Sequence, residues 1–528
     1  MNSNNVVFIA FEERDNLGVG YLASVLSDTG YDSIILDFRS PRGAIINEIQ
    51  RLKPILLGFS VIFQYHIDEF IDLVKYLRGN GVTCHFTAGG HFASLRPQQL
   101  FDLIPELDSL VRFEGEYTLL ELVDALNSGK EWETIKGISY IENGKLMQNE
   151  LRALEPDLDN FPWPVRHKPG EYALGKTYTT ILAGRGCIHD CIFCDIREFY
   201  GPPPGPYKRI RSPEKVIDEM KYLYHEKNCS VFLFQDDDFP VKSDDFSSWV
   251  KKFCNGLSEN NLKGKIMWKI NCRPDEVDDE IFRMMKDYGL YQVFLGIEDG
   301  TDEGLRKMNK KLTASDTLKG TDILKKLGIG IDYGFMLFQP DSTFKSIRTN
   351  LMFLDKLCTD GYMSVTFLKM MPHFATRVEA QLKNQDRLKK VSGFSDYDFL
   401  EKTIDDYYSF VFDIFSGWLQ DPEGLLNTSM WARNFINVYN FFNERNSRID
   451  FLSNTLTELK TESNRYFLNT MFELADIFES GNYKTADDDN LDKYRLAIKE
   501  KHGHLKESFY KIIRRVMIQN NLKELFTV

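Results

Sequence analysis

The chain lacks several features that would assign it to large classes of proteins. No stretch approaches the roughly 18 consecutive apolar residues of a transmembrane helix, and the opening MNSNN has none of the basic charge of a secretory signal. Only 8 of its 528 residues are cysteine, too few for a disulfide scaffold. Acidic residues outnumber basic ones by 78 to 65, and a net charge of -13 disfavours nucleic acid as a partner. We therefore expect a globular protein of the reducing cytoplasm without a transmembrane segment.

Three of the eight cysteines stand close together. Cys187, Cys191 and Cys194 have C-x3-C-x2-C spacing, with Phe193 directly before the third. Three thiolates at this spacing can ligate three irons of a [4Fe-4S] cluster and leave the fourth iron open to a small molecule. One alternative is a zinc site, but zinc usually takes a fourth ligand and His189 lies too close within the loop. The other alternative is three buried thiols. The remaining five cysteines lack metal-ligand spacing and are expected to be core thiols: Cys84, Cys229, Cys254, Cys272 and Cys358.

Short apolar runs alternate with helical patterns over residues 5–128. We expect strands at residues 6–11, 33–38, 55–60, 83–88 and 109–113, and helices at 17–29, 44–52, 67–78 and 119–126. This α/β alternation favours an open, parallel, Rossmann-like sheet with helices on both faces. A hairpin at 138–141 and 145–148 and a proline-bearing link follow. The first domain is therefore predicted at residues 1–135, and the hairpin with its linker at 136–175.

A second alternating segment is predicted to form a domain at residues 176–385. Its expected strands are residues 179–182, 231–234, 266–272, 292–296, 330–338 and 363–370, with helices between them. Six strand–helix units favour a partial (β/α)6 barrel of the TIM type, whose chemistry lies at the C-terminal ends of the strands. After residue 396 no further strands are expected. Residues 386–528, rich in Phe, Tyr and Leu, are predicted to form a C-terminal helical domain.

Polar residues gather where the expected barrel strands end. The second strand ends in FQDDDF (residues 234–239), which contains Asp236 and Asp237. The third ends in NCR (271–273) and the fourth in GIEDG (296–300). Consecutive carboxylates at a strand end are costly unless a cation lies beside them, although a solvated loop or a helix cap is an equal alternative.

Together with the cysteine loop, these motifs resemble the radical S-adenosylmethionine (SAM) enzymes that carry a cobalamin-binding domain. The D-D-x-F run, the G-I-E-x-G turn and the KKLT segment at residues 310–313 match segments of that family. One position departs from it. Phe338 stands where the fifth-strand pattern has glycine, which weighs against a close approach of the backbone to SAM there.

The resemblance implies roles for individual residues of the barrel segment. The three loop cysteines would ligate the [4Fe-4S] cluster, and Phe193 would lie beside SAM. Asp236 or Asp237 would meet the SAM amino group. Arg273 and Glu298 would lie near its ribose and carboxylate.

The N-terminal segment resembles the cobalamin-binding domain of the same family. Its D-x-H-x-x-G element aligns with residues 13–18, so that Asp15 stands where the cobalt-ligating histidine would be, and Asp is a poor ligand for such a metal. We therefore expect cobalamin to bind without a histidine below cobalt, its tail in the crevice of the sheet. His85 and His91 are expected to be core or supporting residues. A fold that has lost cobalamin is the alternative. The residues expected around cobalamin are Asp15, Leu17, Gly18, Ser60, Ile62, Gly89 and Gly90.

By resemblance, the chain would cleave SAM reductively to a 5′-deoxyadenosyl radical, abstract hydrogen from an unactivated carbon and methylate it from cobalamin. Rearrangement, cyclisation or C–C coupling without methyl transfer is an alternative. An iron–sulfur binding or sensor module is an alternative of another class. The substrate is expected to be a natural-product intermediate, a peptide or a lipid. The cluster would take its electron from an external donor of the flavodoxin or ferredoxin type.

Overall fold

The structure is a computed structural model that describes residues 4–12, 16–62, 66–166, 169–239, 244–391, 394–484 and 489–520. The chain divides into two compact units. Unit 1 comprises Met1–Gly170, Thr179–Glu219 and Met371–Asp396. Unit 2 comprises Glu171–Tyr178, Met220–Met370 and Tyr397–Val528. The N-terminal segment and the cysteine loop therefore belong to the same unit.

Unit 1 is built on a seven-stranded sheet in the order β2-β1-β3-β4-β5-β6-β7. The first five strands are parallel and the last two antiparallel. The hairpin predicted to stand apart in the linker therefore extends this sheet. The strands are β1 (Asn5–Ala10), β2 (Asp32–Asp37), β3 (Leu56–Ser60), β4 (His85–Gly89), β5 (Ser109–Val111), β6 (Ile138–Glu142) and β7 (Lys145–Gln148).

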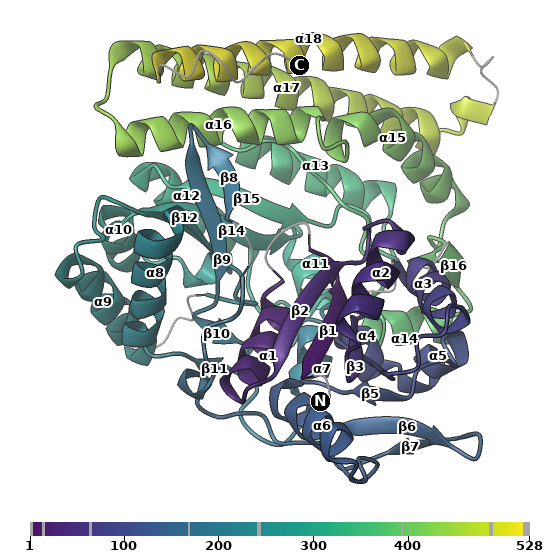
Figure 1. Ribbon diagram of the computed structural model, residues 1–528. Coiled ribbons are helices and arrows are strands. Elements are labelled where there is room, and N and C mark those ends of the chain that lie inside the picture. Colours follow the sequence, from purple (N-terminus) through teal and green to yellow (C-terminus); the bar gives the residue numbers. More distant parts are fainter. Residues whose placement is uncertain are drawn as a thin grey trace. The chain divides into compact units, whose positions relative to one another are not determined.

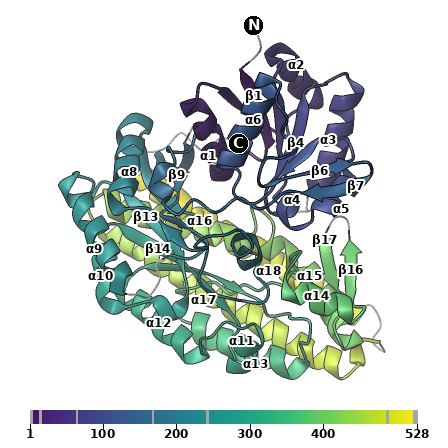
Figure 2. The ribbon, with the colours of Figure 1, turned by 90° about the horizontal axis from the view of Figure 1, so that it is seen from below.

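Helices cover both faces of this sheet, as the alternating pattern predicts. One apolar core joins the sheet to α2, α3 and α5, and a second joins its other face to α1 and α6. Figure 2 shows α1 and α6 on one side of the strands and α3 on the other. The helices are α1 (Leu17–Asp28), α2 (Arg42–Leu52), α3 (Ile67–Gly79), α4 (His91–Leu95), α5 (Pro97–Leu103) and α6 (Glu116–Ser128).

The rest of unit 1 consists of elements from later parts of the chain, among them those that flank the cysteine loop. They are η2 (Leu158–Asn160), β10 (Gly184–Arg185), α7 (Ile196–Tyr200), β11 (Arg209–Ile210), the first part of α8 (Pro213–Lys227), α14 (Arg377–Asn384) and β16 (Leu388–Val391). β10 pairs with β11 in antiparallel orientation, so the chain leaves and re-enters the loop region side by side.

Unit 2 contains the barrel sheet, in the order β15-β14-β13-β12-β9-β8. Strands β12 to β15 are parallel neighbours, as expected for a curled α/β sheet. The strand β9 begins in unit 2 and continues into unit 1 at Thr179. The strands are β8 (Gly170–Ala173), β9 (Lys176–Ile181), β12 (Cys229–Phe234), β13 (Met267–Cys272), β14 (Leu290–Glu298) and β15 (Gly330–Phe335). The helices that follow them are α9 (Asp244–Glu259), α10 (Asp279–Asp287), α11 (Asp302–Lys307), α12 (Ala314–Leu327) and α13 (Phe344–Cys358), and the turn η3 (Pro274–Glu276) follows β13.

The sixth barrel strand predicted at residues 363–370 is wrong. This segment makes a single parallel bridge, between Phe338 and Lys369. Its first part bonds to side chains, because Asn464 accepts from the Val365 amide at 2.8 Å, whereas the amides of Leu368 and Met370 donate to backbone carbonyls at 2.8 and 2.7 Å. Phe338, which replaces the family glycine, is fully buried and packs against Phe367.

The region predicted to be helical, residues 386–528, begins with a two-stranded sheet of β16 and β17 (Phe394–Tyr397) and is helical thereafter. Its elements are α15 (Lys402–Leu419), α16 (Leu425–Phe442), α17 (Ser447–Glu479), η4 (Asn482–Lys484) and α18 (Asp489–Gln519). The long helices α16, α17 and α18 pack on one another, as Figure 1 shows. Within the described residues, no helix is both long and apolar enough to span a lipid bilayer.

Candidate active site

The cysteine loop begins at a glycine that no other residue could replace without displacing the backbone. Gly186 has φ +79°, and a Cβ there would lie 1.7 Å from the carbonyl oxygen of Tyr207. The three loop cysteines are half-buried, and none of the eight cysteines forms a disulfide. The backbone amide of His189 donates to Cys187 Sγ at 3.5 Å. Three free, partly accessible thiols in one loop fit the type and number of ligands that a [4Fe-4S] cluster needs.

The other cysteines differ in burial and in acidity. Cys229, Cys254, Cys272 and Cys358 are buried in unit 2. Burial raises the pKa of the Cys254 and Cys358 thiols to about 12, and that of the half-buried Cys84 to about 11. Because a thiolate is the metal ligand, these protonated thiols are poor candidates. The expectation of core thiols agrees with the burial of the four cysteines of unit 2, whereas Cys84 is half-buried at the edge of a core.

Two buried arginines anchor the start and the return of the loop segment. Arg185, on β10, contacts Glu114 at 3.0 Å and Glu116 at 2.7 Å. Arg209, on β11, contacts Glu114 at 2.8 Å. Glu116 is the first residue of α6, and Glu114 lies just before it in the turn after β5. Burial would raise the pKa of Glu114, but Arg209 and Arg185 hold it below its usual range. The Glu114 carboxylate thus stays charged, and its ion pairs with Arg185 and Arg209 fix the loop against the N-terminal sheet.

His91 supports the chain immediately after the third cysteine. Its Nδ1 lies 3.1 Å from Asp195 Oδ2, and its ring stacks on Phe199 with centroids 4.1 Å apart. Burial alone would raise the pKa of Asp195, but the hydrogen bond from His91 and the nearby imidazoles lower it. The expectation that His91 is a supporting residue is consistent with this position.

A third contact to the loop comes from far along the sequence. Arg377, which opens α14, donates to the Asp190 carbonyl at 2.6 Å and to its carboxylate at 2.8 Å. The next amide, of Val378, donates to the Ile192 carbonyl at 3.3 Å. Sequence reasoning missed Glu114, Arg185 and Arg377, because isolated charges carry no periodic signal that pairs them across a chain.

Most of the residues predicted around cobalamin converge on one edge of the N-terminal sheet. The strand order changes direction between β1 and β3, and ligands of such sheets bind beyond the C-terminal strand ends at that switch point. Ser60 ends β3 and pairs in register with Gly89, which ends β4. Gly90 has φ +104°, and a Cβ there would lie 2.8 Å from the Val61 carbonyl. Ile62 accepts from the amide of Phe92 at 3.2 Å.

The first turn of α1 supplies the other predicted residues at this edge. Gly18 is exposed, and a Cβ on it would meet nothing nearer than 3.7 Å. Asn16 caps the helix by accepting from the Val19 amide at 3.2 Å. The Leu17 side chain instead packs with Leu158 and other core residues. Asp15 lies outside the described residues.

The two remaining histidines of this sheet lie in different places. His85 begins β4, so it lies at the opposite end of the strand from Gly89, and its Nε2 lies 2.7 Å from Ser109 Oγ. His66 precedes α3 at the C-terminal edge, and its ring stacks on Phe11, just after β1. His66 Nδ1 lies 2.7 Å from Glu69. Sequence reasoning missed His66, whose only signal is its place between the third strand and the third helix.

The residues predicted to contact SAM at the second and third barrel strands differ in exposure. Asp236 is buried directly after β12, whereas Asp237 is exposed. Asn271 on β13 donates to the Asp236 carbonyl at 3.2 Å, which ties the two strand ends together. Arg273 is buried, and it donates to Asp275 at 3.0 Å and to the Lys310 carbonyl at 2.6 Å.

Glu298 occupies a strained position at the end of β14. Its φ is +69°, at a register shift between β14 and β15. Such backbone conformations persist where surrounding contacts enforce them, and they cluster at functional sites. Lys310 Nζ lies 3.3 Å from Glu298 Oε1, and Lys310 itself is buried. The next residue, Asp299, accepts hydrogen bonds from Thr301 and Asn350, which fixes the turn. The carboxylate of Glu298 is thus held at the strand end by a buried cation.

Two family models match the chain. The radical SAM superfamily matches residues 181–354, and the B12 binding domain matches residues 11–123. These spans contain the three loop cysteines, the barrel strand ends and the C-terminal edge of the N-terminal sheet. The chain thus carries both kinds of domain in one polypeptide.

Relatives and solved structures agree with these matches. An uncharacterized methyltransferase of Pyrococcus horikoshii is 28% identical over 65% of this chain and 74% of its own length. An anaerobic magnesium-protoporphyrin IX monomethyl ester cyclase of Rubrivivax gelatinosus is 27% identical over 62% of this chain and 60% of its own. The structure of the cobalamin-dependent SAM radical enzyme OxsB with aqua-cobalamin superposes with a TM-score of 0.67 at 19% identity, over 96% of this chain and 84% of that one. The fold is therefore shared with OxsB.

Proposed function

This chain belongs to the cobalamin-dependent radical SAM enzymes, and we propose that it methylates an unactivated carbon of a natural-product, peptide or lipid substrate. When bound, SAM on a reduced [4Fe-4S] cluster supplies a 5′-deoxyadenosyl radical, and cobalamin supplies a methyl group. The protein's own residues hold these groups, orient the substrate and exclude water.

We assign cluster ligation to Cys187, Cys191 and Cys194, whose half-buried thiols contrast with the buried thiols of unit 2. SAM is assigned to Phe193, Asp236 or Asp237, Arg273 and Glu298. Between the two aspartates, Asp237 is exposed and able to meet an ammonium group, whereas Asp236 is buried at the strand end.

In the N-terminal sheet, cobalamin is assigned to the C-terminal edge, with Gly18, Ser60, Ile62, Gly89 and Gly90 around it. Leu17 supports the helix from its core side, and Asp15 keeps the role proposed from the sequence, a residue below cobalt that does not ligate it. Small residues at this edge leave room for a bulky ligand near the backbone.

The observation that carries the proposal is the grouping of the cysteine loop with the N-terminal sheet in one unit. The ion pairs of Arg185 and Arg209 with Glu114, together with the His91–Asp195 contact, join the two. Such buried contacts support a fixed distance and orientation between the loop and the sheet edge. Transfer of a methyl group to a carbon radical requires the two cofactor sites to be held in this way.

The test uses the two by-products of SAM, which can be followed without knowing the substrate. Methyl transfer consumes one SAM as a methyl donor and another as a radical source. Anaerobic enzyme with cluster, cobalamin, reductant and candidate substrates should therefore release both S-adenosylhomocysteine and 5′-deoxyadenosine, as measured by mass spectrometry. If every candidate substrate that is consumed yields 5′-deoxyadenosine without S-adenosylhomocysteine, the proposal is contradicted.

A second candidate function is radical rearrangement, cyclisation or C–C coupling without methyl transfer. A cyclase among the relatives favours it, and the outcome with 5′-deoxyadenosine alone would support it. The names of the relatives, which are enzymes, argue against the alternative of an iron–sulfur sensor. For the one-electron donor we propose a flavodoxin or ferredoxin, and for the location the cytoplasm. The acidic composition argues against a nucleic-acid partner.

A further inference from the structure

The short helix α4 begins at the edge of the N-terminal sheet that is assigned to cobalamin. Gly90 directly precedes its first residue, His91, and the Gly90 carbonyl accepts a hydrogen bond from the Ser94 hydroxyl at 2.7 Å. The Phe92 amide donates to the Ile62 carbonyl at 3.2 Å. Two of the residues assigned to cobalamin, Gly90 and Ile62, therefore fix where α4 begins.

A further hydrogen bond holds the other end of α4. Ser94 is buried, and its hydroxyl oxygen also accepts from the Phe113 amide at 2.7 Å. Phe113 follows β5 with φ +62°, a left-handed conformation that a non-glycine residue keeps only where its surroundings enforce it. The Phe113 ring packs against Phe199 of α7, with centroids 5.6 Å apart. The helix α4 is thus fixed to the ends of β4 and β5 at once.

The first residue of α4 also contacts the chain that follows the third cysteine. His91 Nδ1 lies 3.1 Å from Asp195 Oδ2, and the two side chains are only 19% and 11% exposed. The imidazole lies flat on the Phe199 ring, with 8° between the two planes. Water therefore competes little for this hydrogen bond, which joins the residue after Gly90 to the residue after Cys194.

Asp195 contributes to this contact instead of to its own helix. It is the N-cap residue of α7, a position where an aspartate usually accepts from a helix amide, yet its side chain makes no capping bond to α7. Residues 186–195 contain no helix or strand, so no regular element sets the position of the three thiols. The carboxylate available to cap α7 instead ties the end of this loop to the cobalamin edge.

We propose that His91 is a positioning residue that couples the two cofactor sites, so that cobalamin at the sheet edge stabilises the cluster in the loop. This inference rests on the proposed function, because both cofactors have to bind at these places. Each cofactor orders one side of the His91–Asp195 contact. The second cofactor then finds the contact already formed and loses less conformational entropy on binding. Coupling between sites is reciprocal, so a bound cluster strengthens cobalamin binding by the same factor.

Two substitutions separate the hydrogen bond from the stacked ring. His91→Phe keeps an aromatic ring against Phe199 and loses the hydrogen bond to Asp195. His91→Asn loses the ring, but its amide nitrogen, bonded to Cγ as Nδ1 is, can still donate to Asp195. His85→Phe is the matched control, since His85 lies at the opposite end of β4 from Gly89. A purely structural role of the ring is replaced better by Phe, and a hydrogen-bonding role is replaced better by Asn.

Loss of iron from cluster-loaded protein measures the coupling without turnover. Anaerobic protein is incubated with excess EDTA, with or without hydroxocobalamin at a concentration that calorimetry shows to be saturating for each variant. Protein-bound iron is followed by plasma mass spectrometry. Cobalamin should slow the loss of iron from the wild type about fivefold or more, the lower end of typical coupling between sites. His91→Asn and the control His85→Phe should keep most of this protection, and His91→Phe should lose it.

Equal rates of iron loss with and without bound cobalamin in the wild type would overturn the inference and leave the proposed function intact. Protection of His91→Phe to the wild-type extent would overturn it as well, and so would loss of protection in His91→Asn. Loss of protection in His85→Phe would mean that any change in this sheet removes it, which also contradicts a specific role of His91. If the wild type binds no cobalamin or assembles no cluster, the proposed function fails instead.

Discussion

At the scale of single residues, the eight cysteines show how burial divides one residue type into two roles. The loop cysteines are half-buried, and the His189 amide already donates to one of their sulfurs. Burial keeps Cys254 and Cys358 protonated. Chemistry that needs thiolates is therefore confined to the loop.

Each loop cysteine should be indispensable for the cluster. Cys187→Ala, Cys191→Ala or Cys194→Ala removes one of three protein ligands, so the visible absorption of the cluster and SAM cleavage should be lost. Iron content and absorption of the anaerobically reconstituted protein measure this. Cys84→Ala, which changes a half-buried cysteine of unit 1 outside the loop, is the control and should keep both. A full iron complement in any loop variant would refute the ligand assignment.

Gly18 offers a cleaner steric test of cobalamin binding than Gly89, which ends β4, or Gly90, which follows it. A side chain at Gly90 would strain the backbone at φ +104° and collide with Val61. Gly18 is exposed in a helix, so Gly18→Leu should fold normally and weaken cobalamin binding by about tenfold or more, measured by spectral titration. Gly79→Leu, an equally open glycine at the far end of α3, is the control. Equal cobalamin affinity in both variants would move the binding site elsewhere.

At the scale of elements, alternation and helical periodicity predict strands and helices well when the backbone is satisfied locally. The five parallel strands of the N-terminal sheet lie within two residues of their predicted bounds. The strand predicted at residues 363–370 is reduced to a single bridge, and the Val365 amide bonds to Asn464, about a hundred residues away, rather than to a neighbouring strand. The contacts of Arg185 and Arg377 could not be predicted from the sequence for the same reason. Long-range partners have no signature in a local pattern.

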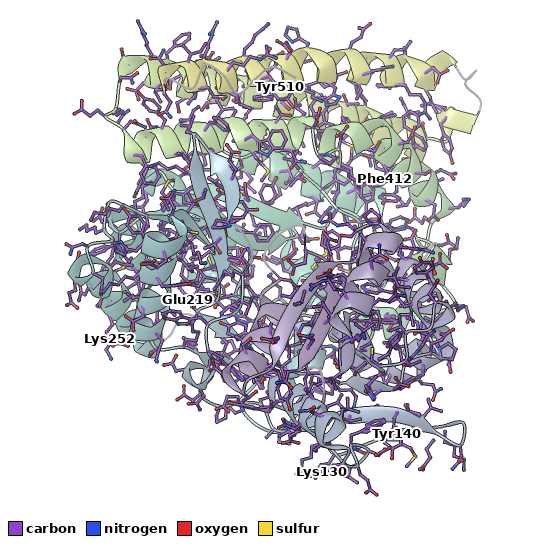
Figure 3. The ribbon with its side chains drawn as sticks, viewed as in Figure 1. Lys130, Tyr140, Glu219, Lys252, Phe412 and Tyr510 are labelled. Atoms are coloured by element: carbon purple, nitrogen blue, oxygen red, sulfur yellow. The ribbon has the colours of Figure 1, made fainter. Side chains whose placement is uncertain are left out.

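The helix α8 contains an ion triad that the sequence does not reveal. Glu219, labelled in Figure 3, is fully buried between Arg166 at 2.5 Å and Arg211 at 2.6 Å. Glu219→Gln leaves two buried arginines without a counter-charge and should lower the free energy of unfolding by about 3–5 kcal/mol. Denaturant titration measures this. The exposed neighbour Asp218→Asn should change it by less than about 0.5 kcal/mol. Similar stabilities of the two variants would show that the triad is not a stabilising element.

At the scale of the whole molecule, one buried lysine sets a pH dependence of stability. Lys460 on α17 is buried, and its Nζ donates to the Tyr362 carbonyl. Burial lowers the pKa of Lys460 from 10.5 to about 7. Between these values the unfolded chain binds a proton that the folded chain does not. Stability from this group therefore rises with pH from about 7 and levels off near 10.5.

Lys460→Met should remove this rise. Between pH 7.5 and 9.5 the free energy of unfolding of the wild type should increase, relative to the variant, by about 1.4 kcal/mol per pH unit. Urea titrations across this range measure the difference. Lys499→Met, an exposed lysine on α18, should follow the wild type. Parallel pH profiles of the wild type and Lys460→Met would mean that the lysine is charged in the folded protein.

The pairing of Arg185 and Arg209 with Glu114 and Glu116 also constrains how such a polypeptide can be recombined. A crossover placed in the link after β7 would inherit the acids from one parent and the arginines from the other. If the donor sheet lacked the two carboxylates, two guanidinium groups would enter the interior unneutralised, at a cost of several kcal/mol. Modular exchange of the N-terminal sheet is therefore expected to succeed only when residues 114 and 116 travel with the loop that they neutralise.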